Sequence, residues 1–170
     1  IANMYMFKKD YKNAVDFYVK AAKKDKNNTT ALINASLCYK MLDMTDKSVE
    51  YANKVLAKEN LSADIYYTAS KIDEIKNIQY LKKAVSLDPM MTDAWLDLAD
   101  IAIKNNRLEL ARTYLKPVKY VNSKDHRYYY LAGLIQKQQG NKEAAQSNFK
   151  KSLEINPFFV EASKELSSQL

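Results

Sequence analysis

The clearest pattern in this 170-residue chain lies near its carboxyl end, where residues 140–157 read GNKEAAQSNFKKSLEINP. Gly140 stands where a helix would stop in a left-handed turn, and Pro157 stands where a second helix could not continue. Between them, Ala145 and Ser152 belong to sets of small residues that recur along the chain. The stretch therefore predicts one helix bounded by two turns, and its small residues connect it to the rest of the sequence.

The small residues recur at a fixed spacing, which is the same from Ala14 to Ser48 as from Ala111 to Ala145. They fill three slots: Ala2, Ser36, Ala99 and Gly133; Ala14, Ser48, Ala111 and Ala145; and Ala21, Val55, Val118 and Ser152. Two helices that cross closely need a small side chain at the crossing, so fixed small positions predict fixed crossings. The spacing is the period of about 34 residues that is typical of a helix–turn–helix array.

Alignment on these slots predicts the helices. Ala14, Phe17, Tyr18 and Ala21 fall at i, i+3, i+4 and i+7, which is one face of a helix. The predicted helices are 1–8, 11–24, 29–42, 45–58, 63–72, 75–87, 92–105, 108–121, 126–139 and 142–155. Thr29 or Thr30 and, in the fourth unit, Thr92 are the expected helix caps.

Two places depart from the period. Ser70 and Asn77 are 7 residues apart, where the same pair of slots elsewhere is separated by 12, so the third unit lacks about five residues and its first helix should be short. Pro117 removes one backbone donor and should kink its helix near residues 113–116. The tail, residues 160–170, continues the pattern through Leu166, Ser167 and Leu170 and either caps the array or begins another repeat.

The composition gives no sign of a catalytic or metal site. Two Gly and three Pro favour an all-helical chain, and one cysteine, Cys38, excludes an internal disulfide and is expected to be buried. The only histidine, His126, begins a predicted helix and is interpreted as a surface residue. We expect no cofactor and no small-molecule substrate. Since no apolar run approaches the roughly 18 residues that a spanning helix needs, we also expect no membrane span. The net charge of +7 is too moderate to define a nucleic-acid binder.

These residues resemble the tetratricopeptide repeat (TPR), most closely in the fifth unit, through Tyr129, Gly133, Gly140, Ala145, Phe149 and Pro157. Trp95, Leu98, Ala99 and Ala111 carry the resemblance in the fourth unit, and Tyr5, Ala14, Tyr18 and Ala21 in the first. The resemblance implies an all-α, right-handed α-solenoid with about five units and a C-terminal capping helix. We expect a single domain, residues 1–170, with units 1–28 (truncated at its start), 29–62, 63–91 (shortened), 92–125 and 126–159 and a capping helix at 160–170.

The resemblance also implies that the first helices line a concave groove that binds a peptide or helix of another protein. The expected groove residues are Asn3, Phe7, Ile33, Asn34, Leu37, Met41, Asp64, Tyr67, Lys71, Asp93, Leu96, Asp97, Asp100, Lys104, Arg127, Tyr130, Leu134 and Lys137. Because Asp93, Asp97 and Asp100 share one helical face, they are either solvated polar positions or a patch for a Lys or Arg of a partner that also has apolar anchors. Some family members bind acidic chaperone tails through a basic clamp. Asp64 and Thr68 occupy the places of its cations, so we do not expect this ligand.

The function expected from the resemblance is a non-enzymatic scaffold or adaptor. Two alternatives remain: the targeting arm of a larger enzyme, or binding of RNA or an anionic surface through lysines of the second helices, which we rank last. Because Ile1 lies inside a repeat, the chain is interpreted as a fragment that a signal or anchor could precede. For the chain itself we expect a cytoplasmic location.

Overall fold

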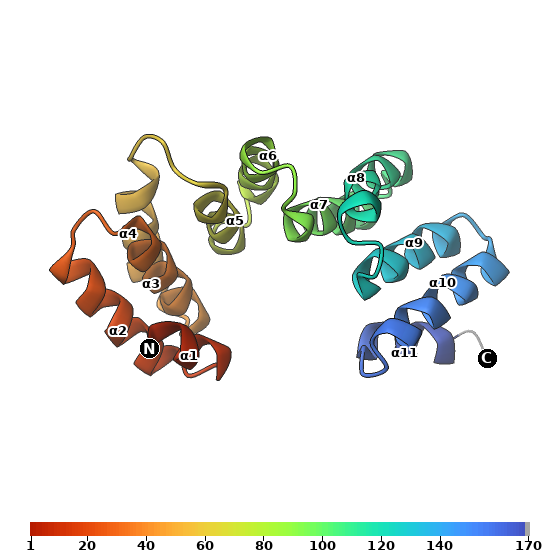
Figure 1. The fold of residues 1–170 in the computed structure, drawn as a ribbon, viewed down its shortest axis with the longest axis horizontal. Helices are drawn as coiled ribbons and strands as arrows, with labels where there is room; N and C mark the ends of the chain where they lie inside the picture. The colour runs from red at the N-terminus through yellow and green to blue at the C-terminus, as the bar shows by residue number, and fades with distance from the viewer. Residues whose placement is uncertain (169–170) are drawn as a thin grey trace. The chain divides into compact units, whose positions relative to one another are not determined.

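The computed structural model describes residues 1–168, which form eleven α-helices and no strand (Figure 1). The helices are α1 (Ala2–Phe7), α2 (Tyr11–Lys24), α3 (Thr29–Met41), α4 (Thr45–Leu56), α5 (Ala63–Ile72), α6 (Asn77–Leu87), α7 (Thr92–Lys104), α8 (Leu108–Val121), α9 (His126–Gln138), α10 (Lys142–Ile155) and α11 (Val160–Ser167). Every helix predicted from the repeat period is present, with ends within a few residues of the predicted ones. Leu170, which was placed in phase with the tail, lies outside the described residues.

The chain divides into two compact units, Ile1–Leu87 and Asp88–Leu170. In the first unit, each of α1 to α5 packs against the helix that follows it, and α3 also packs against α5. In the second unit, α7 packs against α8 and α9, α9 against α8 and α10, and α10 against α11. Each unit therefore stacks consecutive helix pairs as an α-solenoid does. That the whole chain acts as a single domain stays a prediction.

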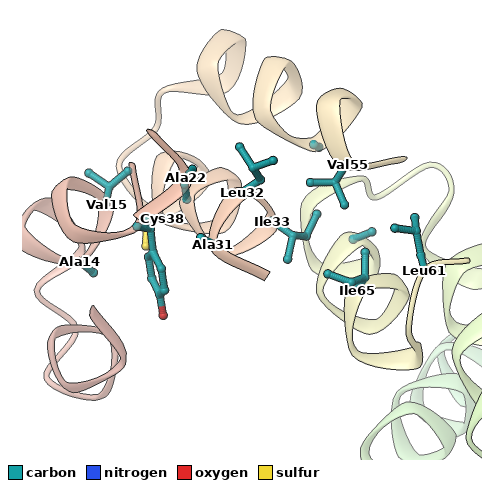
Figure 2. Close-up of a cluster of buried hydrophobic side chains, with 14 residues drawn as sticks. Ala14, Val15, Ala22, Ala31, Leu32, Ile33, Cys38, Val55, Leu61 and Ile65 are labelled. Carbon is teal, nitrogen blue, oxygen red and sulfur yellow. The ribbon is translucent and has the colours of Figure 1, made fainter. Parts of the chain in front are cut away.

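The residues of the small slots lie at the helix crossings. Ala14 and Val55 are fully buried in the core of the first unit, where Figure 2 shows them with Cys38, Ile33 and Ile65 around neighbouring helices. In the second unit, the fully buried slot residues include Ala99, Ala111, Val118, Ala145 and Ser152. A larger side chain at these positions would separate the helices, because protein interiors are packed as densely as organic crystals.

Serine occupies some of the small positions without leaving its hydroxyl unpaired. The Ser36 hydroxyl donates to the backbone oxygen of Ser48 at 2.5 Å, and the Ser152 hydroxyl donates to the backbone oxygen of His126 at 2.8 Å. Each bond joins the two helices that cross at that point. The slots thus accept a small polar side chain because a carbonyl of the facing helix lies within reach.

The turn inside each regular helix pair uses one residue in the left-handed region. Gly140 has φ +80°, as predicted, and Lys9, Asp43 and Asn106 take the equivalent position at φ 58°, 57° and 55°. Lys9 and Asp43 are one repeat apart, as are Asn106 and Gly140, so the turn geometry recurs with the helices. Only one of the four turns uses glycine, which explains how the chain makes them with two glycines in all.

Two expected helix caps are wrong. The side chain of Asn28 caps α3 by accepting from the backbone N–H of Ala31 at 2.9 Å, so Thr29 is the first helical residue. Met91 precedes α7 without a side-chain cap, and Thr92 is already helical. Asparagine and threonine are both good caps, and residue type alone does not fix which of several neighbours takes the position.

The first helix of the third unit is short, as predicted, whereas the kink expected near residues 113–116 stays a prediction. Helix α5 has 10 residues, whereas α3, α7 and α9 have 13 each. Helix α8 runs through Pro117 and continues to Val121. The proline therefore removes one backbone donor from the interior of the helix without ending it.

Candidate functional site

The second unit has a hollow of about 510 Å³ lined by α7, α9, α11 and the residue that precedes α11. We call it the acidic hollow. It is lined by Leu96, Asp97, Asp100, Ile103, Lys104, Arg127, Tyr130, Leu131, Leu134, Gln138, Phe159, Glu161 and Glu165. All three helices are of the kind that was expected to line a groove, namely the first helices of successive repeats.

The structure brings together seven of the predicted groove residues in this hollow. They are Leu96, Asp97, Asp100, Lys104, Arg127, Tyr130 and Leu134. Two more predicted residues form hydrogen bonds with residues of the lining. Asp93 accepts a hydrogen bond from Arg127 at 2.6 Å, and Lys137 donates one to Glu165 at 2.6 Å. The predicted residues of the second unit therefore form one site.

The floor of the acidic hollow is apolar. Leu96, Ile103 and Leu131 are at most 4% exposed and belong to the core of the unit, while Tyr130 and Leu134 are half-buried and pack against that core. Leu96, which was predicted to face the groove, is 2% exposed and belongs to this floor.

An aromatic wall stands beside the floor. The ring of Tyr130 lies perpendicular to that of Phe159, with centroids 5.2 Å apart, and Phe159 in turn meets the His126 ring edge-on at 4.7 Å. Burial raises the pKa of Tyr130, and the nearby carboxylates of Glu165, Asp100 and Glu161 raise it further. The phenol therefore stays neutral and offers the hollow a rigid amphipathic surface.

Arg127 is held by two carboxylates. Its Nη2 atom donates to Asp93 at 2.6 Å and to Asp125 at 2.9 Å. The Asp125 side chain, 7% exposed, also accepts the backbone N–H of Arg127 at 2.9 Å and so caps α9. Burial alone would lower the pKa of Arg127, but its hydrogen bonds to Asp125 and Asp93 raise it. Arg127 therefore acts as a fixed structural cation.

The remaining charges of the acidic hollow are predominantly negative. Asp100 pairs with Lys104 at 2.6 Å, where the lysine side chain is 72% exposed, and within residues 1–168 Glu161 forms no hydrogen bond or ion pair. The lining as a whole has four carboxylates, Asp97, Asp100, Glu161 and Glu165, against the two cations Lys104 and Arg127. This excess is local, since the whole chain carries a net charge of +7.

Sequence reasoning missed the part of the site that α11 contributes. Phe159, Glu161 and Glu165 line the hollow, but the tail was interpreted only as a cap or a further repeat. The signal was present in the period, since Glu161 follows Arg127 by one repeat and Glu165 follows Leu131 by one repeat. Extending the repeat period by one more unit into the tail would have added Glu161 and Glu165 to the predicted groove residues.

In the first unit the predicted groove residues differ in how far they are exposed to solvent. Ile33 is 1% exposed and lies in the core, so the prediction that it faces a partner is wrong; on α3 this position points between the helices. The other predicted residues of this unit are Asn3, Phe7, Met41, Asp64 and Lys71, which are exposed, and Asn34, Leu37 and Tyr67, which are half-buried. Asn3 accepts a hydrogen bond from the Tyr18 hydroxyl at 2.5 Å, and Lys71 lies 4.6 Å from the centre of the Tyr67 ring.

Cys38 is fully buried, as predicted, and its thiol lies 3.2 Å from the Met6 sulfur. Burial raises the pKa of the thiol to about 11, so it is not a nucleophile at neutral pH. Over residues 1–168, no three His, Cys, Asp or Glu side chains are grouped so that they could hold a metal ion. Across the same residues, none of the helices combines the length and apolar character needed to cross a membrane.

Two family models, both described as tetratricopeptide repeat, match the chain. One matches residues 78–135, and the other matches residues 1–28 and 126–159. The chain is 32% identical over 164 residues to a TPR repeat-containing protein of Methanocaldococcus jannaschii. That alignment covers 92% of this chain but only 28% of the relative, so the chain spans less than a third of the relative's length.

Solved structures share the fold. The crystal structure of MamA matches with a TM-score of 0.71 at 25% identity, covering 92% of this chain and 95% of MamA. A thermophilic TPR protein of Thermus thermophilus matches with a TM-score of 0.76 at 15% identity, covering 98% and 94% of the two chains. YrrB, described as a TPR protein with an unusual peptide-binding site, matches with a TM-score of 0.68 at 22% identity, covering 99% and 89%.

Proposed function

The chain belongs to the tetratricopeptide repeat family, and on that premise we propose that it is a non-enzymatic protein-interaction module. In this proposal the acidic hollow of the second unit binds a peptide or helix of another protein. Its partner segment inserts an apolar side chain against Tyr130 and Leu134 and places a Lys or Arg beside the carboxylates. The role of the module is that of a scaffold or adaptor.

One observation carries the proposal: in a basic chain, carboxylates from two separate helices, α7 and α11, flank an apolar floor. Apolar anchors supply most of the affinity of such interfaces, whereas charge complementarity sets the register and the association rate. Lys104 is an exposed i,i+4 partner of Asp100, and such pairs are worth only about 0.3–0.5 kcal/mol, so an incoming cation can displace it.

Matched peptides test this proposal. Two synthetic amphipathic peptides share the same leucines and differ only in their charged residues, lysine in one (Lys/Leu) and glutamate in the other (Glu/Leu). The proteins are the wild type, Leu134→Glu in the acidic hollow, and Leu110→Glu on α8, where Leu110 is an exposed leucine 37% accessible and outside that hollow. Circular dichroism verifies that each variant remains helical.

We expect the Lys/Leu peptide to bind the wild type and Leu110→Glu equally and to bind Leu134→Glu at least about tenfold more weakly, the equivalent of roughly 1.4 kcal/mol. Fluorescence anisotropy gives the dissociation constants. Equal binding to all three proteins would move the peptide site away from the acidic hollow.

The alternative that the chain is the targeting arm of a larger enzyme stays a prediction. The share of the M. jannaschii relative that the chain covers, 28%, leaves room for other domains in a protein of that length. The full reading frame tests this alternative directly. A catalytic domain in the same frame would support it, and a frame made only of repeats would oppose it.

A further inference from the structure

A second hollow, of about 330 Å³, lies on another face of α9, where that helix meets α8. We call it the basic hollow. Its walls include Arg112, Lys116, Lys119, Tyr120 and Tyr128. No carboxylate is among its lining residues, so its charge is opposite in sign to that of the acidic hollow.

Helical spacing brings these residues together. Arg112, Lys116 and Lys119 follow one another by 4 and 3 residues, so all three lie along one face of α8. On α9, Tyr128, Ala132 and Ile135 have the same spacing and line the facing wall. The α9 residues of the acidic hollow, such as Tyr130 and Leu134, are different ones, so a single helix separates the two sites.

The cations of the basic hollow have unused bonding capacity. Within residues 1–168, the exposed Lys116 and Lys119 form no hydrogen bond or ion pair. Arg112 donates to Gln139 through Nη2 and forms an ion pair with the exposed Glu109, 3.5 Å from its Nε, and this buried Nε has no hydrogen-bond partner. An arginine can donate five hydrogen bonds, so this guanidinium still has donors for an incoming carboxylate.

The floor of the basic hollow is apolar. Leu115 and Ile135 are 5% and 2% exposed, and the half-buried Ala132 lies beside them. The hollow has room for one or two apolar side chains above this floor. Tyr120, 89% exposed, stands at the edge, where its ring can cover a bound side chain.

We propose that the basic hollow is a second protein-binding site, specific for an acidic segment. The segment places one apolar side chain on Leu115 and Ile135 and its carboxylates on Arg112, Lys116 and Lys119. The apolar floor favours a protein ligand over RNA, because a nucleic acid has no aliphatic side chain to bury there. The unit would then bind two segments of opposite charge on two faces of α9.

The test uses the 170-residue protein and three probes. These are the Glu/Leu peptide, a Glu/Ser peptide in which serine replaces each leucine, and a single-stranded RNA oligonucleotide. The variant is the double substitution Lys116→Gln with Lys119→Gln, two exposed side chains whose loss leaves the core intact. The matched control is Lys142→Gln with Lys150→Gln, which removes the same charge from exposed positions on α10.

We expect the Glu/Leu peptide to bind the Lys116→Gln, Lys119→Gln variant about fivefold to thirtyfold more weakly than the wild type, since two solvent-exposed charge pairs are lost. The control variant should bind it like the wild type, and the Lys/Leu peptide should bind all three proteins alike. Affinity of the Glu/Leu peptide should also fall as salt rises.

Three results would overturn the proposal. Equal binding of the Glu/Ser and Glu/Leu peptides would show that the floor is not used. An equal loss in both double variants would show attraction to general surface charge. RNA binding that is tighter than peptide binding and lost only in Lys116→Gln, Lys119→Gln would assign the hollow to nucleic acid. None of these results bears on the acidic hollow, because the Lys/Leu peptide tests that site separately.

Discussion

At position 133 the crossing of α9 and α10 leaves room for a hydrogen atom and no more. A Cβ built on Gly133 would lie 2.5 Å from Phe149 Cε1 and 2.7 Å from Cδ1. The Phe149 ring is fully buried. Glycine fills this slot because the ring of the facing helix takes the volume that a methyl group would need.

We therefore predict that Gly133→Ala destabilises the protein. The substitution gains about 1 kcal/mol of helix propensity, but overpacking a filled core costs roughly 1–3 kcal/mol, so we expect a net loss on the order of 1 kcal/mol. Urea unfolding followed by circular dichroism measures it. Gly140→Ala is the comparison: nothing lies within 4 Å of its Cβ, and only the φ of +80° is strained. A Gly133→Ala variant as stable as the wild type would show that the ring can move.

The protonation state of Asp125 makes the free energy of unfolding depend on pH. Burial disfavours its charged form, but hydrogen bonds from the side chain and backbone N–H of Arg127 outweigh burial, so the pKa of Asp125 lies below its ordinary value of 3.8. A carboxyl group whose pKa is lowered by folding stabilises the folded state above that ordinary value. This stabilisation is lost as the pH falls through the lowered pKa.

We predict that Asp125→Asn lowers the free energy of unfolding at pH 7 by about 1–3 kcal/mol, because Arg127 loses a charged partner. The wild type should lose stability as the pH falls below 3.8 and approach the variant, which lacks the titrating group. Urea unfolding at a series of pH values gives both curves. Parallel curves from pH 7 down to pH 2 would mean that Asp125 does not contribute in this way.

At the scale of the single helix, one residue of α8, Pro117, lowers the stability of that helix. Pro117 lies well inside the helix and cannot donate a hydrogen bond to the carbonyl of Thr113. A proline in a helix interior costs about 3 kcal/mol relative to alanine, although the surrounding structure can relieve part of this. The helix nevertheless continues to Val121, so its packing compensates for the missing bond.

Pro117→Ala should accordingly stabilise the protein, by about 1–2 kcal/mol once relief by the surroundings is allowed for. The midpoint of thermal unfolding, followed by circular dichroism, should rise. Lys116→Ala, the neighbouring substitution to the same residue on an exposed position, controls for the general effect of alanine in this helix. A lower midpoint for Pro117→Ala than for the wild type would mean that the proline supports the turn after α8.

The helices of this chain could be predicted because one physical requirement, a small side chain at each crossing, recurs once in every repeat. Helix ends were less predictable: Asn28, Thr29 and Thr30 are all plausible caps, and the choice depends on the path of the chain before α3. Within the acidic hollow, the phase placed Tyr130 and Leu134 on one lining, and their contact with a partner stays a prediction. The phase wrongly predicted that Ile33 faces the groove. Neighbouring helices cover this position of α3, and the repeat period alone does not predict how far they do so.

On the scale of the whole molecule, the division into Ile1–Leu87 and Asp88–Leu170 suggests two units that each stabilise themselves. In repeat proteins, stability is approximately the sum of the stabilities of the repeats and of the interfaces between nearest neighbours. Leu81 and Phe149 provide a matched pair for testing this, because they are 1% and 0% exposed in the cores of the first and second units.

We predict that the effects of Leu81→Ala and Phe149→Ala stay within their own units. Each should cost about 2–5 kcal/mol through the cavity it leaves. Hydrogen exchange read by mass spectrometry should show lost protection over residues 1–87 for Leu81→Ala and over 88–168 for Phe149→Ala. Since both proposed sites lie in the second unit, Leu81→Ala should leave binding of the Lys/Leu and Glu/Leu peptides unchanged, whereas Phe149→Ala should weaken both. Loss of protection along the whole chain in either variant would mean that the protein unfolds as one cooperative body.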